Sequence, residues 1–390
     1  MNKRVNLICI ACIFMALSVT GCFGKEEINQ LTIIAGVGMD VSQKEEGIQL
    51  TVQAILPEEI QEQVKLEEGQ RPVWLGTVTG DSIFDAVRNL SLLTGSRILW
   101  GHSQVLIIGE EAARQGIKET IDWFERSPEF RRRTFIMVAK GEARSIIEAK
   151  EGIDKIPAFN IGKLNEGSEN TSKVVSRDLR MLISTLSSKT TCAILPGITV
   201  YNKIDREGKE NKATKIQDTA VFKDYKLIGW LNEKETRGLL WVLGEVKSGV
   251  IDVQHPKDEE RFISFEIIRA GSKIKPRIKD NKVTIIIEIN EKGNIASVPS
   301  PIIDISKPKN ILELEEAKKS AIEKDVSLAL TKAKEMNADI FGIGEAIHRD
   351  YPKEWKKLEQ EWDSIFPNLE IEVRVSSKLR RTGLITINKN

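Results

Sequence analysis

The sequence predicts an α+β protein of more than one domain, built from mixed sheets with helices. Apolar runs with the two-residue period of strands alternate with helical spacing through residues 31–149. Short β-like runs separated by charged turns follow in residues 249–289, which favours an antiparallel arrangement. Helical spacing then dominates residues 311–365. The C-terminal domain is therefore predicted to be an antiparallel sheet packed by long helices.

The first half of the chain is predicted to alternate strands and helices. The predicted strands are residues 31–40, 48–56, 73–78, 104–108, 134–138 and 194–201. The predicted helices are residues 82–93, 110–126, 142–149 and 177–188. Asp81 is the expected N-cap of the first helix, and Phe84 is expected on its apolar side. Residues 152–170 are rich in Asp, Lys, Asn, Gly and Ser, which predicts a long surface excursion.

The second half is predicted to place strands before long helices. Residues 223–225 are expected to turn a hairpin, and Asn232 with Glu235 has the pattern of a capping box that opens a helix ending at Leu243. The predicted strands are residues 220–222, 226–230, 249–253, 261–268, 283–289, 369–375 and 384–387. The predicted helices are residues 311–336, 340–347 and 352–365, the last with Pro352 in its first turn.

The amino terminus has the parts of a lipoprotein signal peptide. Residues 2–4 are short and positive, and residues 5–17 are apolar but too few to span a bilayer comfortably. Small residues then lead directly to Cys22, which an ordinary secretory signal does not need. We therefore expect cleavage before Cys22 and acylation of its thiol, with two acyl chains holding the protein on the outer face of a bacterial membrane. An ordinary secretory signal or an uncleaved anchor is the alternative.

These signals divide the chain into four parts. Residues 1–21 are the predicted lipoprotein signal peptide, and residues 22–201 are an N-terminal α/β region with room for two subdomains. Residues 202–217 are charged and almost without apolar side chains, which predicts a linker or an extended hairpin. Residues 218–390 are the predicted C-terminal α+β domain. No apolar run after Cys22 approaches 18 residues, so no further membrane span is expected.

Charge and cysteine content argue against several classes of protein. Removal of the signal peptide leaves 56 basic and 57 acidic residues, and so balanced a surface gives no electrostatic case for binding nucleic acid. Cys9 and Cys12 leave with the signal peptide and Cys22 is acylated, so Cys192 alone remains and no intramolecular disulfide is possible. The apolar neighbours of Cys192 favour an inert core thiol over a nucleophile.

No catalytic, cofactor-binding or metal-binding set is found in the sequence. Gly36 and Gly38 lack the third glycine and the following helix of a dinucleotide site, so a turn is favoured. His102, His255 and His348 are too far apart for metal-ligand spacing. His102 is expected to be a hydrogen-bonded structural group, and His255 is expected in solvent. We predict no enzyme and no cofactor, although a pair of carboxylates acting as acid and base stays open.

Two aromatic clusters are suited to packing or to binding. The first is a possible partner surface, formed by Trp123, Phe124, Arg126 and Arg131. For this cluster the favoured alternative is that the aromatic rings pack inside while arginines pair with glutamates at the rim. Trp355 and Trp362 are seven residues apart and so share one helix face. We expect this pair to pack against the sheet, with a partner surface as the alternative.

Three groups of residues carry a resemblance to a known family. They are Gly21-Cys22 with Ala35-Gly36-Val37-Gly38-Met39-Asp40, then Asp122-Trp123-Phe124-Glu125-Arg126 with Arg131, and last Asp339-Ile340-Phe341-Gly342 with Tyr351-Pro352, Trp355 and Trp362. With these motifs the chain resembles the C-subunit lipoproteins of bacterial spore germinant receptors (Ger(x)C type) over essentially its whole length. Phe23-Gly24 departs from the Trp-Asp pair that usually follows the lipid-bearing cysteine in this family.

The resemblance implies a non-enzymatic subunit with several mixed α/β domains. Such a subunit is anchored by lipid in the inner membrane of the dormant spore and associates with polytopic A- and B-type subunits. The complex responds to small nutrients and triggers germination, and Cys22 is the one functional residue that the resemblance transfers. A solute-binding lipoprotein that feeds a membrane transporter is the alternative. It would need two similar lobes, whereas the sequences before and after residue 210 do not look alike. A surface hydrolase would need an acid and base set that the scattered histidines do not offer.

Overall fold

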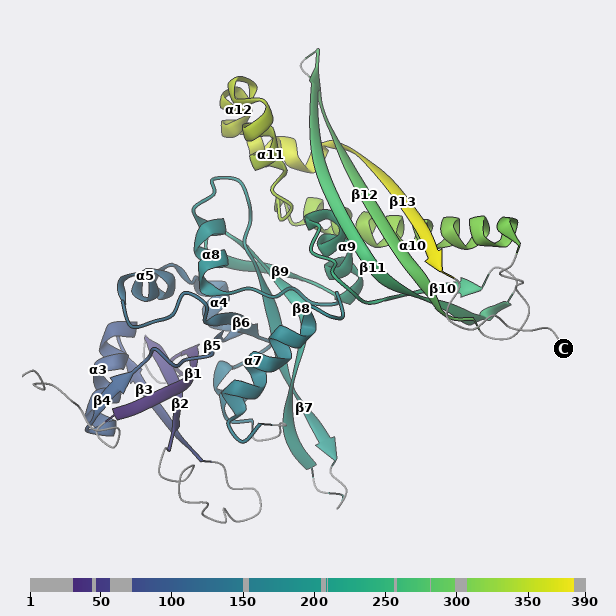
Figure 1. Cartoon of the computed structure of the whole chain (residues 1–390). Coiled ribbons are helices and arrows are strands. Elements are labelled where there is room, and N and C mark those ends of the chain that lie inside the picture. The colour runs from purple at the N-terminus through teal and green to yellow at the C-terminus, as the bar shows by residue number, and fades with distance from the viewer. Residues whose placement is uncertain are drawn as a thin grey trace, which may run out of the picture.

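The computed structural model describes residues 31–43, 47–56, 72–149, 154–204, 208, 210–255, 258–280, 282–298 and 307–381. Within these residues the chain forms two β-sheets, each covered by helices, with the first sheet at lower left and the second at upper right in Figure 1. The predicted α+β class with mixed sheets is confirmed. Cys22 and the strand predicted at residues 384–387 lie outside the described residues.

The first sheet is mixed and, in the described part of the chain, has nine strands. Its order is β3-β2-β1-β5-β6-β7-β8-β9, and β4 pairs with β1 outside this path. The strands are β1 (Leu31–Val41), β2 (Ile48–Ile55), β3 (Val73–Gly80), β4 (Arg97–Leu99), β5 (Val105–Ile108), β6 (Phe135–Ala139), β7 (Ile194–Ile204), β8 (Glu210–Lys223) and β9 (Lys226–Leu231). The neighbours β1, β5, β6 and β7 run parallel, and the strands on both sides of them pair antiparallel.

Helices cover both faces of the first sheet and bury two separate apolar cores. One face is covered by α3 (Ile83–Thr94), α4 (Glu110–Gln115), α5 (Lys118–Arg126) and α8 (Leu179–Leu186). The other face is covered by α6 (Ala143–Ile147) and α7 (Pro157–Ser168). The central strand β5 is buried along its whole length, as its continuous apolar sequence requires.

Two predictions for the first helix are wrong. The side chain of Ser82, and not that of Asp81, accepts a hydrogen bond from the backbone N–H of Asp85 and caps α3. Phe84 is 58% exposed, because the buried face of α3 is formed instead by Ile83, Ala86 and Leu90.

The single helix predicted at residues 110–126 is divided into α4 and α5, since Gly116 takes a φ of 136° between them.

The surface excursion predicted at residues 152–170 is wrong, because α7 occupies most of it. Pro157 begins this helix, and Asn160 and Asn165 are buried in it although their polarity breaks the apolar pattern expected of a helix. The backbone N–H of Ala158 donates to Oε1 of the buried Gln53 at 2.9 Å. Packing on the sheet therefore stabilises a helix that its own sequence does not predict.

Residues 202–217 were predicted as a linker or a hairpin, and strand pairing shows the hairpin. β7 and β8 pair antiparallel from Ile194 with Val221 out to Ile204 with Glu210. The predicted turn at residues 223–225 is confirmed, since Asp224 and Tyr225 take positive φ values between β8 and β9. β8 and β9 thus continue the first sheet, and the division of the chain into domains at residues 202–217 stays a prediction.

The second sheet has the order β10-β11-β12-β13 in the described residues. Its strands are β10 (Val250–His255), β11 (Asp258–Lys279), β12 (Lys282–Ser297) and β13 (Glu370–Arg381). β11 and β12 form the long hairpin that rises to the top of Figure 1. The first three strands pair antiparallel as predicted, but β13 runs parallel to β12. This departure from an all-antiparallel sheet follows from the helical crossover at residues 308–368, the kind of connection that parallel strands need.

The helices of the second region are α9 (Glu233–Leu243), α10 (Pro308–Glu335), α11 (Ile343–Asp350), α12 (Pro352–Leu358) and α13 (Trp362–Ile365), with 3₁₀ turns η2 (Glu359–Glu361) and η3 (Phe366–Asn368). The predicted capping box is confirmed, because Asn232 accepts from the N–H of Glu235 and the Glu235 carboxylate accepts from the N–H of Asn232. The predicted helix 352–365 is broken into α12, η2 and α13. Its tryptophans nevertheless pack as expected, since Trp355 and Trp362 are buried with ring centroids 5.1 Å apart.

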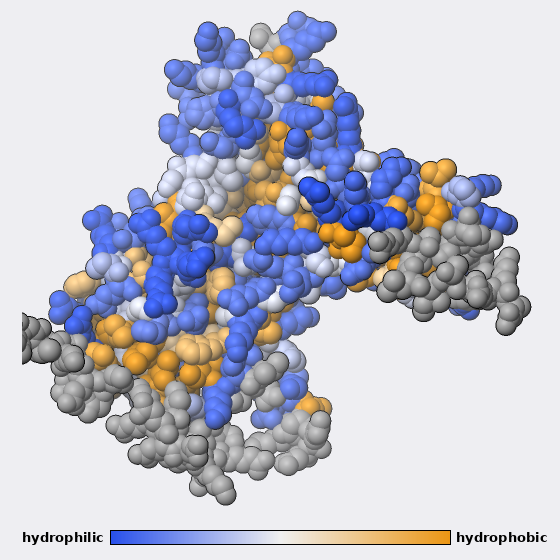
Figure 2. All heavy atoms as spheres, in the orientation of Figure 1, coloured by the Kyte–Doolittle hydropathy of each residue, from blue (hydrophilic) through white to orange (hydrophobic). Residues whose placement is uncertain are grey.

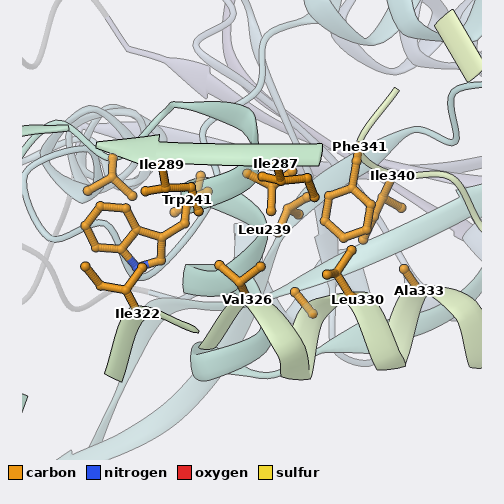
Figure 3. Close-up of a cluster of buried hydrophobic side chains, with 14 of the residues drawn as sticks. Leu239, Trp241, Ile287, Ile289, Ile322, Val326, Leu330, Ala333, Ile340 and Phe341 are labelled. Atoms are coloured by element: carbon orange, nitrogen blue, oxygen red, sulfur yellow. The ribbon is translucent and has the colours of Figure 1, made fainter. Parts of the chain in front are cut away.

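Figure 3 shows the core between α9, α10 and the second sheet. Trp241 of α9 lies beside Ile289 of β12 and Ile322 of α10, and all three are buried. The two helices approach so closely that a Cβ added at Gly238 would lie 2.0 Å from the carbonyl oxygen of Asp325. The same core includes Val221 from the first sheet. The two sheets therefore share one continuous apolar interior.

A buried ion pair ties α10 to the second sheet. Nζ of Lys318 lies 2.9 Å from Oε2 of Glu291, and each side chain is at most 1% exposed. The Ser377 hydroxyl donates to the same carboxylate oxygen at 2.8 Å, and the Lys318 ammonium also donates to the carbonyl oxygen of Lys378 at 3.3 Å. The ammonium lies 5.5 Å from the ring centroid of Phe265. These contacts join α10 to β11, β12 and β13.

We predict that Lys318→Met lowers the free energy of unfolding by about 3–5 kcal/mol, because it leaves the Glu291 carboxylate buried without its partner. The double variant Lys318→Met/Glu291→Leu should recover most of this loss, since no uncompensated charge remains. Urea denaturation followed by circular dichroism measures both. A single variant as stable as the wild type would contradict the account of this pair.

Candidate functional site

The histidines do not assemble into a reactive site. His102 and His348 are exposed, whereas His255 is 2% exposed, so the expectation that His255 lies in solvent is wrong. The reason is that β10 continues to His255, which pairs with Asp258 of β11. Among the described residues no group of three or more His, Cys, Asp or Glu side chains is placed to hold a metal ion.

The thiol of Cys192 is unsuited to nucleophilic chemistry. Burial, and secondarily the charge of Asp339, raises the pKa of Cys192 to about 12. At neutral pH this group therefore stays protonated and weakly reactive. The expectation of an inert core thiol agrees with this environment.

The aromatic residues of the predicted partner surface pack mainly with one another. Phe124 and Phe130 are buried with ring centroids 4.4 Å apart, and Trp123 is half-buried with its ring 5.1 Å from Phe130. Trp100, from the end of β4, completes the cluster at 5.7 Å from Trp123. Phe124 is thus part of the core, whereas Trp123 is only partly buried.

The arginines beside this cluster are exposed. Nε of Arg126 donates to Oδ2 of Asp122 at 2.8 Å across one helical turn of α5. The hydrogen bond between these two exposed side chains raises the pKa of Arg126 and lowers the pKa of Asp122. Arg131 lies on the surface in the loop that follows. The use of Trp123, Arg126 and Arg131 as a partner surface stays a prediction.

The two halves of the molecule meet around a polar cavity of about 190 Å³. Its walls come from the turn before β7, the turn between β8 and β9, and the helical segment 337–366. Nζ of Lys223 bridges this cavity, because it donates to the carbonyl oxygen of Asn337 and to Oδ1 of Asp363, both at 2.8 Å. A second link lies at a distance from it, where the guanidinium of Arg177 binds both carboxylate oxygens of Glu245 at 2.9 and 3.1 Å.

Asp339 organises the C-terminal side of this junction. Its carboxylate accepts hydrogen bonds from the backbone N–H groups of Phe341, Ile343 and Gly344 at 3.3, 3.0 and 2.7 Å. Its carbonyl oxygen accepts from the N–H of Cys192 at 2.8 Å, which ties the junction to the start of β7. Burial raises the pKa of Asp339 to about 6, although these backbone donors act in the opposite direction. The predicted helix 340–347 consequently begins at Ile343, after this turn.

The described structure begins at Leu31, the first residue of β1. Leu31 pairs with Arg97 of β4, and the Thr32 and Ser96 hydroxyls are hydrogen-bonded to each other. Eight residues separate Leu31 from Cys22, so an extended connection between them reaches at most about 30 Å. Across the described residues, no helix has the length and apolar character needed to cross a bilayer.

Two family models match the chain. The model described as "Spore germination protein N-terminal domain" matches residues 24–200, and "Spore germination B3/ GerAC like, C-terminal" matches residues 217–383. The chain belongs to the GerAC-like family of spore germination proteins. Two relatives come from Bacillus subtilis (strain 168). Spore germination protein KC is 28% identical over 395 residues, which cover 96% of each chain. Spore germination protein B3 is 25% identical over 382 residues, which cover 95% of this chain and 96% of that one.

A solved structure of the same fold also matches the chain. The crystal structure of the GerBC protein covers 88% of this chain and 96% of its own, with a TM-score of 0.54 and 22% sequence identity. This similarity supports the arrangement of the two sheets and their helices.

Gly36 and Gly38, from the first group of residues that carries the family resemblance, have packing roles. A Cβ added at Gly36 would lie 2.8 Å from the Cβ of Ala158 in α7, and one at Gly38 would lie 3.0 Å from Ile147 in α6. The Asp40 carboxylate accepts from the N–H groups of Ala143 and Arg144 at 2.7 and 2.9 Å, and so caps α6. This part of the motif therefore holds α6 and α7 against β1, and the expected glycine turn is wrong because Gly36 and Gly38 lie within that strand.

We predict a pH dependence of stability that originates in Asp339. Its pKa is raised in the folded state, so the folded chain binds a proton more tightly than the unfolded chain between pH 4 and 6. The free energy of unfolding should therefore fall by up to about 3 kcal/mol as pH rises through this window.

Asp339→Asn should remove this fall, because the amide does not titrate. The measurement is the difference between the wild-type and variant unfolding free energies from urea curves at several pH values. Asp363→Asn, at an exposed carboxylate on the same cavity, is the matched control and should keep the wild-type slope. Parallel curves for the wild type and Asp339→Asn would refute the assignment.

Proposed function

We propose that this chain is a lipid-anchored, non-enzymatic subunit of a receptor that starts spore germination when nutrients arrive. It assembles with polytopic A- and B-type membrane subunits at the outer face of the spore inner membrane. The observation that carries the proposal is the whole-chain match to spore germination proteins, which extends over 96% of both this chain and protein KC. The lipoprotein signal peptide that ends just before Cys22 would leave this cysteine to carry the lipid anchor.

The arrangement of polar groups supports a role in assembly rather than in catalysis. The buried carboxylates of Asp40 and Asp339 are both engaged by backbone N–H groups at helix starts. The Cys192 thiol is held protonated by its surroundings. Each of these groups therefore has a structural role in the fold.

Acylation supplies the physical basis for assembly. Each methylene buried in the bilayer contributes about 0.8 kcal/mol, so two acyl chains anchor a protein stably. Confinement to a thin layer at the membrane raises the effective concentration of the globular part near its membrane partners. A modest contact surface is then sufficient for association with them.

We predict that Cys22→Ala releases the protein from the membrane and abolishes the nutrient response of the spore. Cys192→Ala is the matched control, since it removes the other cysteine of the mature chain but leaves the anchor. Membrane fractionation and the loss of optical density of spores given amino acids and sugars measure the two effects. Full germination by spores whose only copy carries Cys22→Ala would overturn the proposal.

A further inference from the structure

Helix α3 presents apolar side chains to solvent on the side that faces away from the sheet. Leu92 is 84% exposed, Phe84 is 58% exposed and Leu93 is 54% exposed. Phe84, Arg88 and Leu92 follow one another at four-residue spacing and so form one exposed stripe, and Leu93 flanks Leu92 in the last turn. We call Phe84, Leu92 and Leu93 the α3 patch. Apolar side chains that gather on one exposed surface in this way are typical of sites that contact a partner or a membrane.

The α3 patch lies beside the point where the chain enters the fold. α3 ends at Thr94, and two residues later Ser96 is hydrogen-bonded to Thr32, followed by Arg97 paired with Leu31. Figure 2 shows hydrophobic surface at the lower left of the molecule, in the part of the view where Figure 1 places α3, β3 and β4. In the same view the second sheet lies at the upper right and α12 lies at the top, both far from α3.

The length of the connection limits what can cover the patch. This step rests on the proposed acylation of Cys22, which places that residue at the bilayer surface. The eight intervening residues let Leu31 lie no more than about 30 Å from the lipid. Leu92 and Leu93 lie within a few residues of the strand that pairs with Leu31, so this tether length keeps them within reach of the bilayer surface.

Basic groups accompany the apolar ones, as at surfaces that contact lipid headgroups. The guanidinium of Arg88 lies 5.3 Å from the ring centroid of Phe84, on the exposed side of α3. Arg97 is 59% exposed and has the Glu129 carboxylate 3.7 Å away. Arginines that lie beside apolar side chains extend to phosphates while their neighbours enter the acyl boundary. Asp85 lies in the first turn of α3 beside Phe84, and Asp81 precedes the helix, so both acidic groups are at the end of α3 away from Leu92, Leu93 and the chain entry.

We propose that the α3 patch rests in the interfacial layer of the membrane to which Cys22 is anchored. The lipid tether and the patch then form two attachments at one end of the molecule. With two attachments, the body does not rotate freely about its tether, and the β11–β12 hairpin and α12 are directed away from the bilayer. The covering group is thus the lipid surface, and neither a second copy nor a soluble partner is needed.

The test places a polarity-sensitive fluorophore at Ser91→Cys, an exposed position two turns after Phe84 on the same side of α3 and next to Leu92 in the chain. The full acylated chain is purified from bacterial membranes and reconstituted in phosphatidylethanolamine and phosphatidylglycerol vesicles. Labelling is selective because Cys22 is blocked and the pKa of Cys192 is raised to about 12. The matched probe is Lys357→Cys, exposed on α12 at the distant side.

The expected result is a blue shift at Ser91→Cys and quenching by nitroxide lipids, with neither effect at Lys357→Cys. Adding Phe84→Ser, Leu92→Ser and Leu93→Ser should abolish both effects at position 91 while the acylated protein still floats with the vesicles. Leu312→Ser with Leu328→Ser removes exposed leucines from α10 and should change nothing.

The outcomes separate this proposal from the one on which it rests. If the protein floats with vesicles but the position 91 probe is not quenched, the patch does not contact lipid, and the anchor stands. If quenching survives the three serine substitutions, the patch is not what holds α3 at the membrane, and the proposal fails. If mass spectrometry finds no acyl chains and the protein does not float, the lipid anchor itself is overturned, and this proposal with it.

Discussion

Helix α9 is buried between the two sheets, and the rest of the molecule is arranged around that burial. Gly238 lets α9 approach α10 to a distance that no side chain would permit. Nε of Arg237 lies 2.6 Å from Oδ2 of Asp325 beside this crossing, where burial raises the pKa of the carboxyl despite its partner. Val221 and Leu231 of the first sheet share a core with Phe265 of the second. Each sheet therefore buries apolar side chains of the other that would otherwise meet water.

The shared core bears on the proposed lipid anchor at one end of the chain. The chain enters at β1, far in Figure 1 from the β11–β12 hairpin, and the two sheets between them form a continuous body. The links across the junction, from Arg177 to Glu245 and from Lys223 to Asp363, add directional contacts to the apolar ones. A body of this kind would carry the orientation set by the proposed anchor at Cys22 through to the β11–β12 hairpin. Two halves joined by a flexible linker would not do so.

Local chemistry predicted the elements whose cause lies within a few residues. The capping box at Asn232, the turn at residues 223–225 and the buried strand β5 follow from side chains next to one another. Long-range packing decided what failed. α7 forms because β1 offers glycines and β2 offers Gln53, and His255 is buried because its strand is longer than its sequence indicates.

The same distinction holds for the candidate sites. Cys22 lies outside the described residues, and its acylation stays a prediction from the local pattern on which signal processing acts. The exposure of Phe84 could not be predicted, because helical spacing alone does not tell which side of α3 meets the sheet.

Native-state hydrogen exchange in rising urea most directly tests whether α9 unites the two sheets. Exchange is measured at the amides of Ile107 in β5 and Ile287 in β12. If α9 unites the two sheets, both amides open with the same free energy, in one global unfolding. Opening of Ile287 at low urea while Ile107 stays protected would contradict it.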